Sequence, residues 1–203
     1  MWCEKPLVDT WERAIYIYDM FKKNNNLLFV DWTYTFNPCI IALKKILKDK
    51  KLKQIILNRT NNGPARTDAT SIEDLSTHDL SILYYLFGTD ETLKFHWNEF
   101  SLDESKKTGS NLSWCYKDGV QILINSSWQH DQKNRASIFI TDDDKIIMFD
   151  DINKVIIDDG KKINYSGEIT PLHAAMIKFS GADNFESNKK ITLKITETCN
   201  LTI

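Results

Sequence analysis

The segment THDLSILYYLFG, residues 77–88, decides the fold because it separates two kinds of hydrophobic pattern. Its apolar residues recur at the spacing of an amphipathic helix, and Gly88 is a residue type that commonly ends helices. Before this segment the apolar residues keep mostly to a helical period, whereas after it they fall in short runs between polar turns. We therefore expect an α+β protein in which residues 1–90 are rich in helices and residues 91–203 are rich in strands.

The first half contains two further predicted helices and two short predicted strands. Residues 9–23 begin with a capping-box pattern and continue with apolar residues on one helical stripe. Asn37 and Pro38 start another helix, because Asn is a good N-cap and Pro is tolerated in the first turn. The apolar runs 27–32 and 54–58 are too short for independent helices, so we predict buried strands there.

The second half is predicted to form an antiparallel meander. Its apolar runs are rich in β-branched and aromatic residues, and the turns between them contain Asp and Gly. The predicted strands are residues 93–100, 120–125, 136–141, 145–149, 154–157, 172–179 and 191–195. We expect one domain over residues 1–203, with a helical N-terminal half packed on a mostly antiparallel sheet formed by the C-terminal half.

Length and composition exclude several classes of protein. The chain has 203 residues, of which 42% are hydrophobic and 27% charged, with 26 basic residues against 28 acidic ones. This composition can bury a core, and it excludes a disordered tail, a collagen-like fibre and a general nucleic-acid-binding protein. No run approaches the roughly 18 apolar residues of a membrane helix, and the start lacks a signal-peptide core. We expect a cytoplasmic protein with neither a membrane nor a nucleic acid as its partner.

The sequence contains no pattern for a metal or a cofactor. The four cysteines form no C-x-x-C pair and the four histidines form no His-x-x-x-His pair, so the spacing of zinc ligands is missing. The turn around Gly63 is not followed by the Gly-Lys of a phosphate-binding loop. We accordingly predict no metal site and no cofactor.

Cys39 and His173 suggest covalent catalysis. Cys39 lies just inside the predicted start of a helix, where the helix dipole favours a thiolate. His173 opens a predicted strand, and Asp183, Asn184 or Asn188 could orient its ring. This order of a helix-borne Cys, a later His and then an Asn or Asp resembles papain-like cysteine hydrolases, which implies a hydrolase or deamidase. Alternatively Cys39, which precedes Ile40 and Ile41, is an unreactive core residue.

Charge is segregated along the chain. Residues 22–59 contain eight Lys and one Arg against two Asp, whereas residues 142–159 contain seven Asp against two Lys. Alternate turns of a meander lie at the same end of the sheet, so most of these aspartates are expected to share one rim. An acidic rim attracts a basic surface on another protein, although the same aspartates also suit hairpin turns and edge protection.

The leading hypothesis from the sequence is a non-enzymatic protein-binding module. We expect a cytosolic inhibitor or immunity-type protein that neutralises a toxin or nuclease through its acidic surface, because complementary charge speeds association. Trp is enriched among the residues that anchor such interfaces. The expected contact residues are Asp142, Asp143, Asp144, Asp158 and Asp159, with Trp128 as the aromatic anchor.

Overall fold

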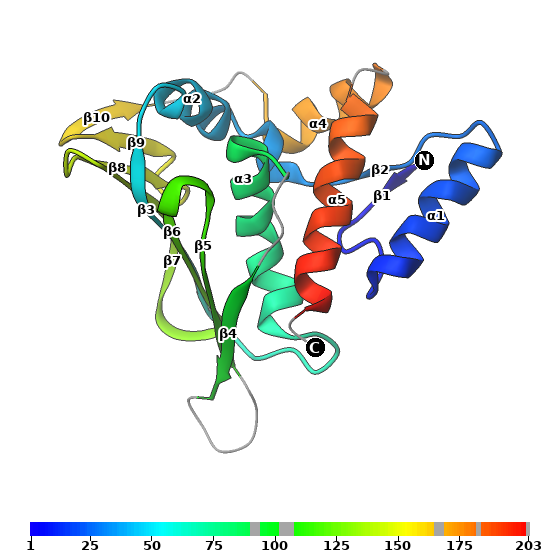
Figure 1. The fold of residues 1–203 in the computed structure, drawn as a ribbon, viewed down its shortest axis with the longest axis horizontal. Coiled ribbons are helices and arrows are strands. Elements are labelled where there is room, and N and C mark those ends of the chain that lie inside the picture. Colours follow the sequence, from blue (N-terminus) through cyan, green and yellow to red (C-terminus); the bar gives the residue numbers. More distant parts are fainter. Residues whose placement is uncertain (90–93, 102–107, 165–168, 182–183, 202–203) are drawn as a thin grey trace.

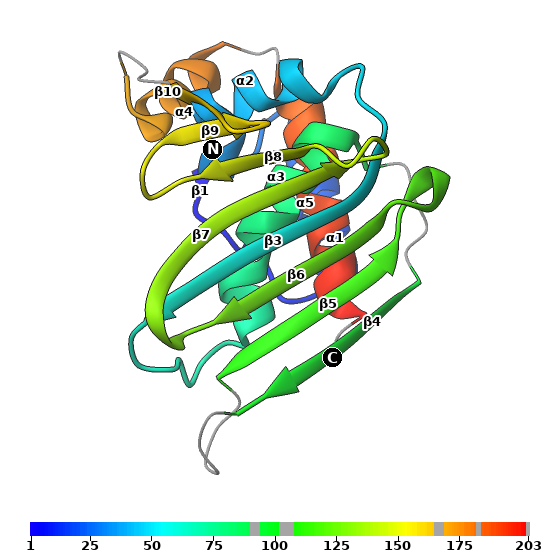
Figure 2. The same cartoon turned by 90° about the vertical axis from the view of Figure 1, so that its left-hand side faces the viewer.

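The protein has two layers, an eight-stranded sheet and a set of helices that lies against one of its faces (Figure 1). A computed structural model describes residues 1–89, 94–101, 108–164, 169–181 and 184–201. When the molecule is turned by 90°, the opposite face of the sheet is in front and the helices lie behind it (Figure 2). One face of the sheet therefore borders the core, and no helix of the described residues covers the other face.

The sheet has the strand order β10-β9-β8-β7-β3-β6-β5-β4. Its strands are β3 (Leu52–Asn62), β4 (Phe95–Phe100), β5 (Gly109–Cys115), β6 (Gln121–Ser127), β7 (Gln129–Thr141), β8 (Ile146–Asp150), β9 (Val155–Asp158) and β10 (Lys161–Asn164). β3 and β6 run parallel, and every other neighbouring pair in this sheet is antiparallel. The sheet is therefore mixed, because β3 has a parallel neighbour, β6, on one side and an antiparallel neighbour, β7, on the other.

In the described residues, five α-helices and three shorter helical segments accompany the sheet. The α-helices are α1 (Trp11–Lys23), α2 (Pro38–Leu47), α3 (Thr77–Phe87), α4 (Pro171–Ser180) and α5 (Phe185–Asn200). The short segments are η1 (Thr33–Phe36), η2 (Ile72–Ser76) and η3 (Lys117–Gly119). Within the described part of the chain, no helix has the length and apolar character needed to cross a membrane.

The core lies between the sheet and the helices behind it. Successive residues of a strand point to opposite faces, so Ile55 and Leu57 of β3 face the helices, and Phe139 of β7 lies beside Ile55 on that face. These side chains belong to the same buried cluster as Leu80 and Leu83 of α3. Full burial of an apolar side chain of this size stabilises a fold by about 1.5–3 kcal/mol, so this contact anchors α3 on the sheet.

A separate pair of short parallel strands, β1 (Trp2–Cys3) and β2 (Phe29–Val30), holds the N-terminal segment. Asn188 of α5 fixes this pair, because its side-chain amide donates to the Val30 carbonyl at 2.8 Å and its oxygen accepts the Val30 N–H at 2.9 Å. Asn188 is buried, so both of its hydrogen bonds are shielded from water. The backbone that leads into Lys5 is therefore tied to the C-terminal helix.

The expected arrangement of a helical N-terminal half on a sheet from the C-terminal half is wrong. β3 belongs to the N-terminal half and is nevertheless an interior strand, with β7 on one side and β6 on the other. Residues 172–179 and 191–195, which we expected to be strands, lie in α4 and α5. Both halves of the chain contribute to both layers (Figure 1).

Local hydrogen bonds explain why these two C-terminal segments are helices. Thr170 is the N-cap of α4, where its side-chain oxygen accepts the His173 N–H at 3.2 Å, and Pro171 occupies the first turn. In α5 the hydroxyls of Thr192 and Thr196 each donate to the carbonyl four residues earlier, at 2.9 Å. A helix thus accommodates the β-branched residues whose abundance had suggested a strand.

Candidate functional site

A cavity of about 610 Å³ lies where the N-terminal segment meets η2, α3 and α5. Its polar lining includes side chains from separate parts of the chain: Lys5 follows β1, Arg66 lies in the loop after β3, Asp74 belongs to η2, and His78 belongs to α3. A concave surface with a few convergent polar groups is the usual form of a small-molecule site. We therefore take this cavity as the candidate functional site.

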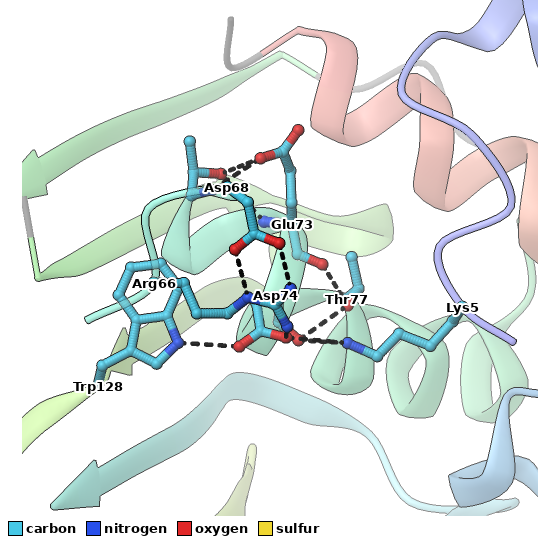
Figure 3. A network of polar contacts seen from close by, with 8 residues as sticks. Lys5, Arg66, Asp68, Glu73, Asp74, Thr77 and Trp128 are labelled. Atoms are coloured by element: carbon cyan, nitrogen blue, oxygen red, sulfur yellow. Dashed lines mark hydrogen bonds and ion pairs between the residues drawn. The ribbon is translucent and has the colours of Figure 1, made fainter. Parts of the chain in front are cut away.

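Lys5 reaches from the N-terminal segment to η2. Its Nζ donates to the backbone carbonyl of Asp74 at 2.7 Å and lies 3.3 Å from the Asp74 Oδ1 atom (Figure 3). Burial disfavours the ammonium form and lowers the pKa of Lys5, and the positive charges of Arg66 and Arg59 act in the same direction. Asp74 opposes this shift without cancelling it. The amine of Lys5 therefore loses its proton more readily than that of an exposed lysine.

The carboxylate of Asp74 is contacted at both oxygens. Oδ1 lies 3.5 Å from Nη1 of Arg66 as well as facing Lys5, and Oδ2 accepts a hydrogen bond of 2.9 Å from the indole N–H of Trp128 (Figure 3). Hydrogen bonds to a charged group are the stronger kind, so these partners hold the carboxylate in one orientation. Asp74 thus connects the N-terminal segment, the loop after β3 and the junction of β6 with β7.

A capping box sets the position of η2. Oε2 of Glu73 accepts the Thr70 N–H at 2.7 Å, and the hydroxyl oxygen of Thr70 accepts the Glu73 N–H at 3.2 Å. η2 is a turn of π-helix, a conformation that is frequent at functional sites. Because Asp74 directly follows Glu73, this cap fixes the backbone that presents the carboxylate.

His78 lies between the main cavity and a smaller one of about 350 Å³. Its ring meets that of Tyr34 edge to face, with 5.4 Å between the ring centroids. Burial is the first cause that lowers the pKa of His78 well below its ordinary value, and the positive charges of Arg59 and Lys5 add to it. The imidazole is therefore neutral near pH 7, with one ring nitrogen as a donor and the other as an acceptor.

A buried ion pair ties α3 to the sheet next to His78. Nε and Nη2 of Arg59 donate to the two carboxylate oxygens of Asp79, at 2.8 and 2.9 Å, and Nη1 donates to the Tyr34 hydroxyl at 2.9 Å. Arg59 is at a core-facing position of β3, where it is only 3% exposed. This bidentate contact satisfies an arginine that would otherwise be costly to bury, and it fixes the residue that follows His78.

Cys39 and His173 do not have the environment that the hydrolase hypothesis requires. Cys39 is buried at the start of α2, and burial raises the pKa of its thiol, which is the opposite of activation. His173 is exposed in the first turn of a helix, α4, and not on a strand. Asp183, the expected orienting residue, lies outside the described residues.

The aspartate-rich turns lie at one end of the outer strands. They carry Asp142, Asp143 and Asp144 after β7, and Asp158 and Asp159 at the end of β9. Three lysines pair with them: Lys145 with Asp143, Lys53 with Asp144, and Lys50 with Asp158. Two of these lysines come from the basic stretch 22–59, so the charges that are segregated in the sequence meet in space and partly neutralise each other.

Trp128, the expected aromatic anchor for a partner, belongs to the cavity network instead. The side chain is 4% exposed and its N–H is bonded to Asp74. A tryptophan with so little free surface offers a partner almost nothing to contact. Its position explains its burial, because the end of β6 brings the indole to η2.

Sequence reasoning missed the main members of this site. Asp74 and His78 are four residues apart, a spacing that places side chains on one helical face, and this signal was available. Lys5 gives no such signal, because only the pairing of β1 with β2 carries it to η2. Among the residues described, no group of three or more His, Cys, Asp or Glu side chains is placed to hold a metal ion.

Comparison with known proteins shows similarity in structure and not in sequence. No protein-family model matches the chain, and no curated protein matches it. A protein of Magnetospirillum magnetotacticum described as an oxidoreductase is 20% identical, with a TM-score of 0.84 over 98% of this chain and 70% of that one. UDP-N-acetylglucosamine 3-dehydrogenase GnnA of Acidithiobacillus ferrooxidans is 17% identical, with a TM-score of 0.80 over 100% and 69%.

A third solved structure contains a nicotinamide dinucleotide. It is a variant of KijD10, a 3-ketoreductase from Actinomadura kijaniata, in complex with TDP-benzene and NADP. It is 11% identical to this chain and has a TM-score of 0.77 over 98% of this chain and 67% of that one. The chain therefore shares the fold of these solved proteins over almost its whole length.

This fold contradicts the two functions expected from the sequence. The solved proteins named above are described as an oxidoreductase, a dehydrogenase and a ketoreductase, which contradicts the hypotheses of a non-enzymatic inhibitor or immunity-type protein and of a papain-like hydrolase. Identities of 11–20% establish the fold alone. The chemistry of this chain has to be argued from its own cavity.

Proposed function

We propose that this chain provides the substrate-binding side of a nicotinamide-dependent oxidoreductase that interconverts a secondary alcohol and a ketone on a sugar-like molecule. The observation that carries the proposal is the amine of Lys5, which contacts Asp74 in the same cavity as the neutral ring of His78. The names of two solved proteins with this fold, a 3-dehydrogenase of UDP-N-acetylglucosamine and a 3-ketoreductase, support the reaction class.

Lys5 has the properties of the acid–base group in such a reaction. When an alcohol is oxidised to a ketone, its hydroxyl loses a proton and its carbon loses a hydride. The neutral amine of Lys5 accepts the proton, and the carboxylate of Asp74, 3.3 Å from Nζ, stabilises the ammonium that forms. In the reverse direction the ammonium returns this proton to the ketone oxygen. Burial lowers the pKa of Lys5, which favours the neutral amine that accepts the proton.

His78 suits the binding of the same substrate oxygen. Because its ring is neutral, the imidazole can donate a hydrogen bond without competing with Lys5 for the proton. The contact with Tyr34 and the neighbouring pair of Arg59 with Asp79 restrict how the ring can turn. His78 therefore orients the reacting carbon, while Lys5 moves the proton.

A nicotinamide dinucleotide, when bound, accepts the hydride from the substrate or supplies it. The described residues fit the reacting ends of the substrate and the nicotinamide, because one cavity brings Lys5 and His78 together. Their parallel pairings are β1 with β2 and β3 with β6, and neither forms the parallel sheet with a Gly-rich turn that usually holds the pyrophosphate. A dinucleotide that reacts on this chain therefore has to bind its pyrophosphate through other contacts. We therefore assign no residue of this chain to the phosphates.

The direct test measures formation of reduced nicotinamide at 340 nm. The chain is mixed with NAD⁺ or NADP⁺ and a panel of nucleotide sugars and polyols, each in the presence and absence of the protein. We expect protein-dependent reduction with at least one member of the panel. Lys5→Met should lower its rate about 10²–10⁴-fold, the usual contribution of a positioned acid–base group.

Lys44→Met is the matched control for this test. Lys44 is also a lysine whose pKa burial lowers, and its Nζ donates to the Tyr85 carbonyl at 2.7 Å, away from the Asp74 network. This variant should keep the wild-type rate. Equal losses in Lys5→Met and Lys44→Met, or no reduction with any compound, contradict the proposal.

A further inference from the structure

One oxygen atom of Asp74 faces two cations. Oδ1 lies 3.3 Å from Nζ of Lys5 and 3.5 Å from Nη1 of Arg66 (Figure 3). The far side of the same guanidinium is held by Asp68, whose carboxylate accepts from Nε at 3.0 Å and from Nη2 at 2.6 Å. Arg66 is therefore clamped between two carboxylates, with one edge directed at the partner of Lys5.

We propose that Arg66 is a positioning residue that shares Asp74 with Lys5 and so keeps the lysine from being locked as an ammonium ion. The inference rests on the proposed function, in which the neutral amine of Lys5 accepts a proton. It extends that function to Arg66, a residue of the cavity lining whose side chain is 49% exposed.

The physical basis is competition for one negative charge. An arginine stays charged at every pH that a protein tolerates. The positive charge of Arg66 therefore offsets part of the attraction between the Asp74 carboxylate and the ammonium form of Lys5, and it also repels that ammonium group directly. If Arg66 were absent, Asp74 would stabilise the ammonium form of Lys5 alone. The pKa of Lys5 is lowered chiefly by burial, and the charge of Arg66 acts in the same direction.

Other groups around Lys5 do not replace Arg66 in this role. The charged and titratable groups that line the cavity with Lys5 or act on its charge are Asp9 from the N-terminal segment, Arg66 and Asp68 from the loop after β3, Glu73 and Asp74 from η2, His78 from α3, Cys199 from α5, and Arg59 from β3. Arg59 is the second positive charge, but its guanidinium donates to Asp79 and Tyr34 and not to Asp74. Glu73 is engaged with Thr70 in the capping box. Apart from Lys5 itself, Arg66 is the cation of the described residues that contacts the Asp74 carboxylate.

The test titrates the amine of Lys5 directly and needs no turnover. The folded chain is labelled with trace acetic anhydride between pH 7 and 11, and mass spectrometry gives the labelling of Lys5 relative to the exposed Lys22. Only the neutral amine reacts, so the midpoint of the profile reports the protonation of Lys5. The midpoint is compared instead of the absolute rate, because removing Arg66 also changes access to the cavity.

In Arg66→Gln the midpoint should move to higher pH, so that the neutral fraction of Lys5 at pH 8 falls, by at most about tenfold because the half-exposed Arg66 is partly screened by solvent. Arg66→Lys keeps a positive charge and should restore most of the wild-type midpoint, which separates charge from a general loss of structure. Arg13→Gln is the matched control, since Arg13 pairs with Asp9, another residue of the cavity wall, and not with Asp74. It should leave the midpoint in place.

An unchanged midpoint in Arg66→Gln, or an equal shift in Arg13→Gln, overturns the inference. The labelling experiment tests the role of Arg66, and the 340 nm assay tests the oxidoreductase proposal, so the two proposals can be contradicted independently. A shifted midpoint without any turnover contradicts the oxidoreductase proposal alone. Turnover that depends on Lys5, together with an unmoved midpoint in Arg66→Gln, contradicts the role of Arg66 alone.

Discussion

At the scale of single residues, the carboxylate of Asp74 receives contacts from three side chains, and two of them, Lys5 and Trp128, are distant from it in the sequence. Lys5 and Arg66 face one of its oxygens, and the N–H of Trp128 donates to the other (Figure 3). Each contact has a different consequence. Lys5 takes part in proton transfer, Arg66 adjusts the charge around it, and Trp128 sets the orientation of the carboxylate.

Trp128→Phe removes the indole N–H and keeps most of the buried ring. Because a hydrogen bond to a charged group contributes about 1.5–3 kcal/mol, the free energy of unfolding in urea should fall by this amount plus the cost of the smaller ring. Trp114→Phe is the matched control, since Trp114 is also buried and its Nε1 has no hydrogen-bond partner among the described residues. Equal losses in the two variants contradict the role of the Asp74 contact.

His78 makes stability depend on pH in a defined direction. Its pKa is lower in the folded protein than in the unfolded chain, so below about pH 6.5 the unfolded chain binds a proton that the folded protein excludes. This contribution to the free energy of unfolding is present above that pH. It is lost on acidification with a slope of at most about 1.4 kcal/mol per pH unit.

Urea unfolding of the wild type and of His78→Gln, compared between pH 7.5 and 5, checks this slope. The variant lacks the titrating ring, so its stability should fall less over the same interval. Other groups that titrate in this range contribute equally to both proteins and cancel in the difference. Parallel pH profiles for the two proteins contradict a buried neutral His78.

At the scale of elements, β3 both anchors α3 on the sheet and leads into the loop that carries Arg66. Its core-facing residues anchor α3, and one of them is a buried arginine instead of an apolar residue. Arg59 meets Asp79 from α3 at hydrogen-bond distance through two nitrogens. β3 therefore positions both His78, through the neighbouring Asp79, and the loop that carries Arg66.

Breaking the pair of Arg59 with Asp79 should be more harmful than removing it entirely. Arg59→Met leaves the Asp79 carboxylate buried without its partner, and such a loss costs about 3–5 kcal/mol of unfolding free energy. The double variant Arg59→Met with Asp79→Leu removes the unpaired charge and should lose less. Urea unfolding of the two variants checks the order, and a double variant at least as unstable as Arg59→Met contradicts it.

Sequence patterns predicted some of these elements and misassigned others for physical reasons. The predicted N-cap Asn37 is present, with its side chain accepting the Cys39 N–H at 2.9 Å, because this contact is local. The strands predicted at residues 172–179 and 191–195 were wrong. The N-cap Thr170 starts a helix at the first segment, and the β-branched threonines of α5 are a residue type typical of strands. Lys5 has no local signature at all, because tertiary pairing alone brings it to Asp74.

At the scale of the whole molecule, the candidate site lies on the helical side of the sheet and draws on both ends of the chain. The N-terminal segment supplies Lys5, α5 closes the cavity, and Asn188 of α5 ties these two parts together. The sheet acts as the rigid support, and the loops and helix starts at its edge present the reactive groups. This division of labour is common in enzymes that hold catalytic side chains on a stable scaffold.

The central claim is that Lys5 transfers the substrate proton, and the pH dependence of alcohol oxidation at 340 nm tests it most directly. The wild-type rate should rise with pH to a plateau, with a midpoint below the ordinary lysine value of about 10.4, because the neutral amine is the active form and its pKa is lowered. Lys5→Met should be slower and lose this rise. A variant that keeps the wild-type rate and midpoint contradicts the account.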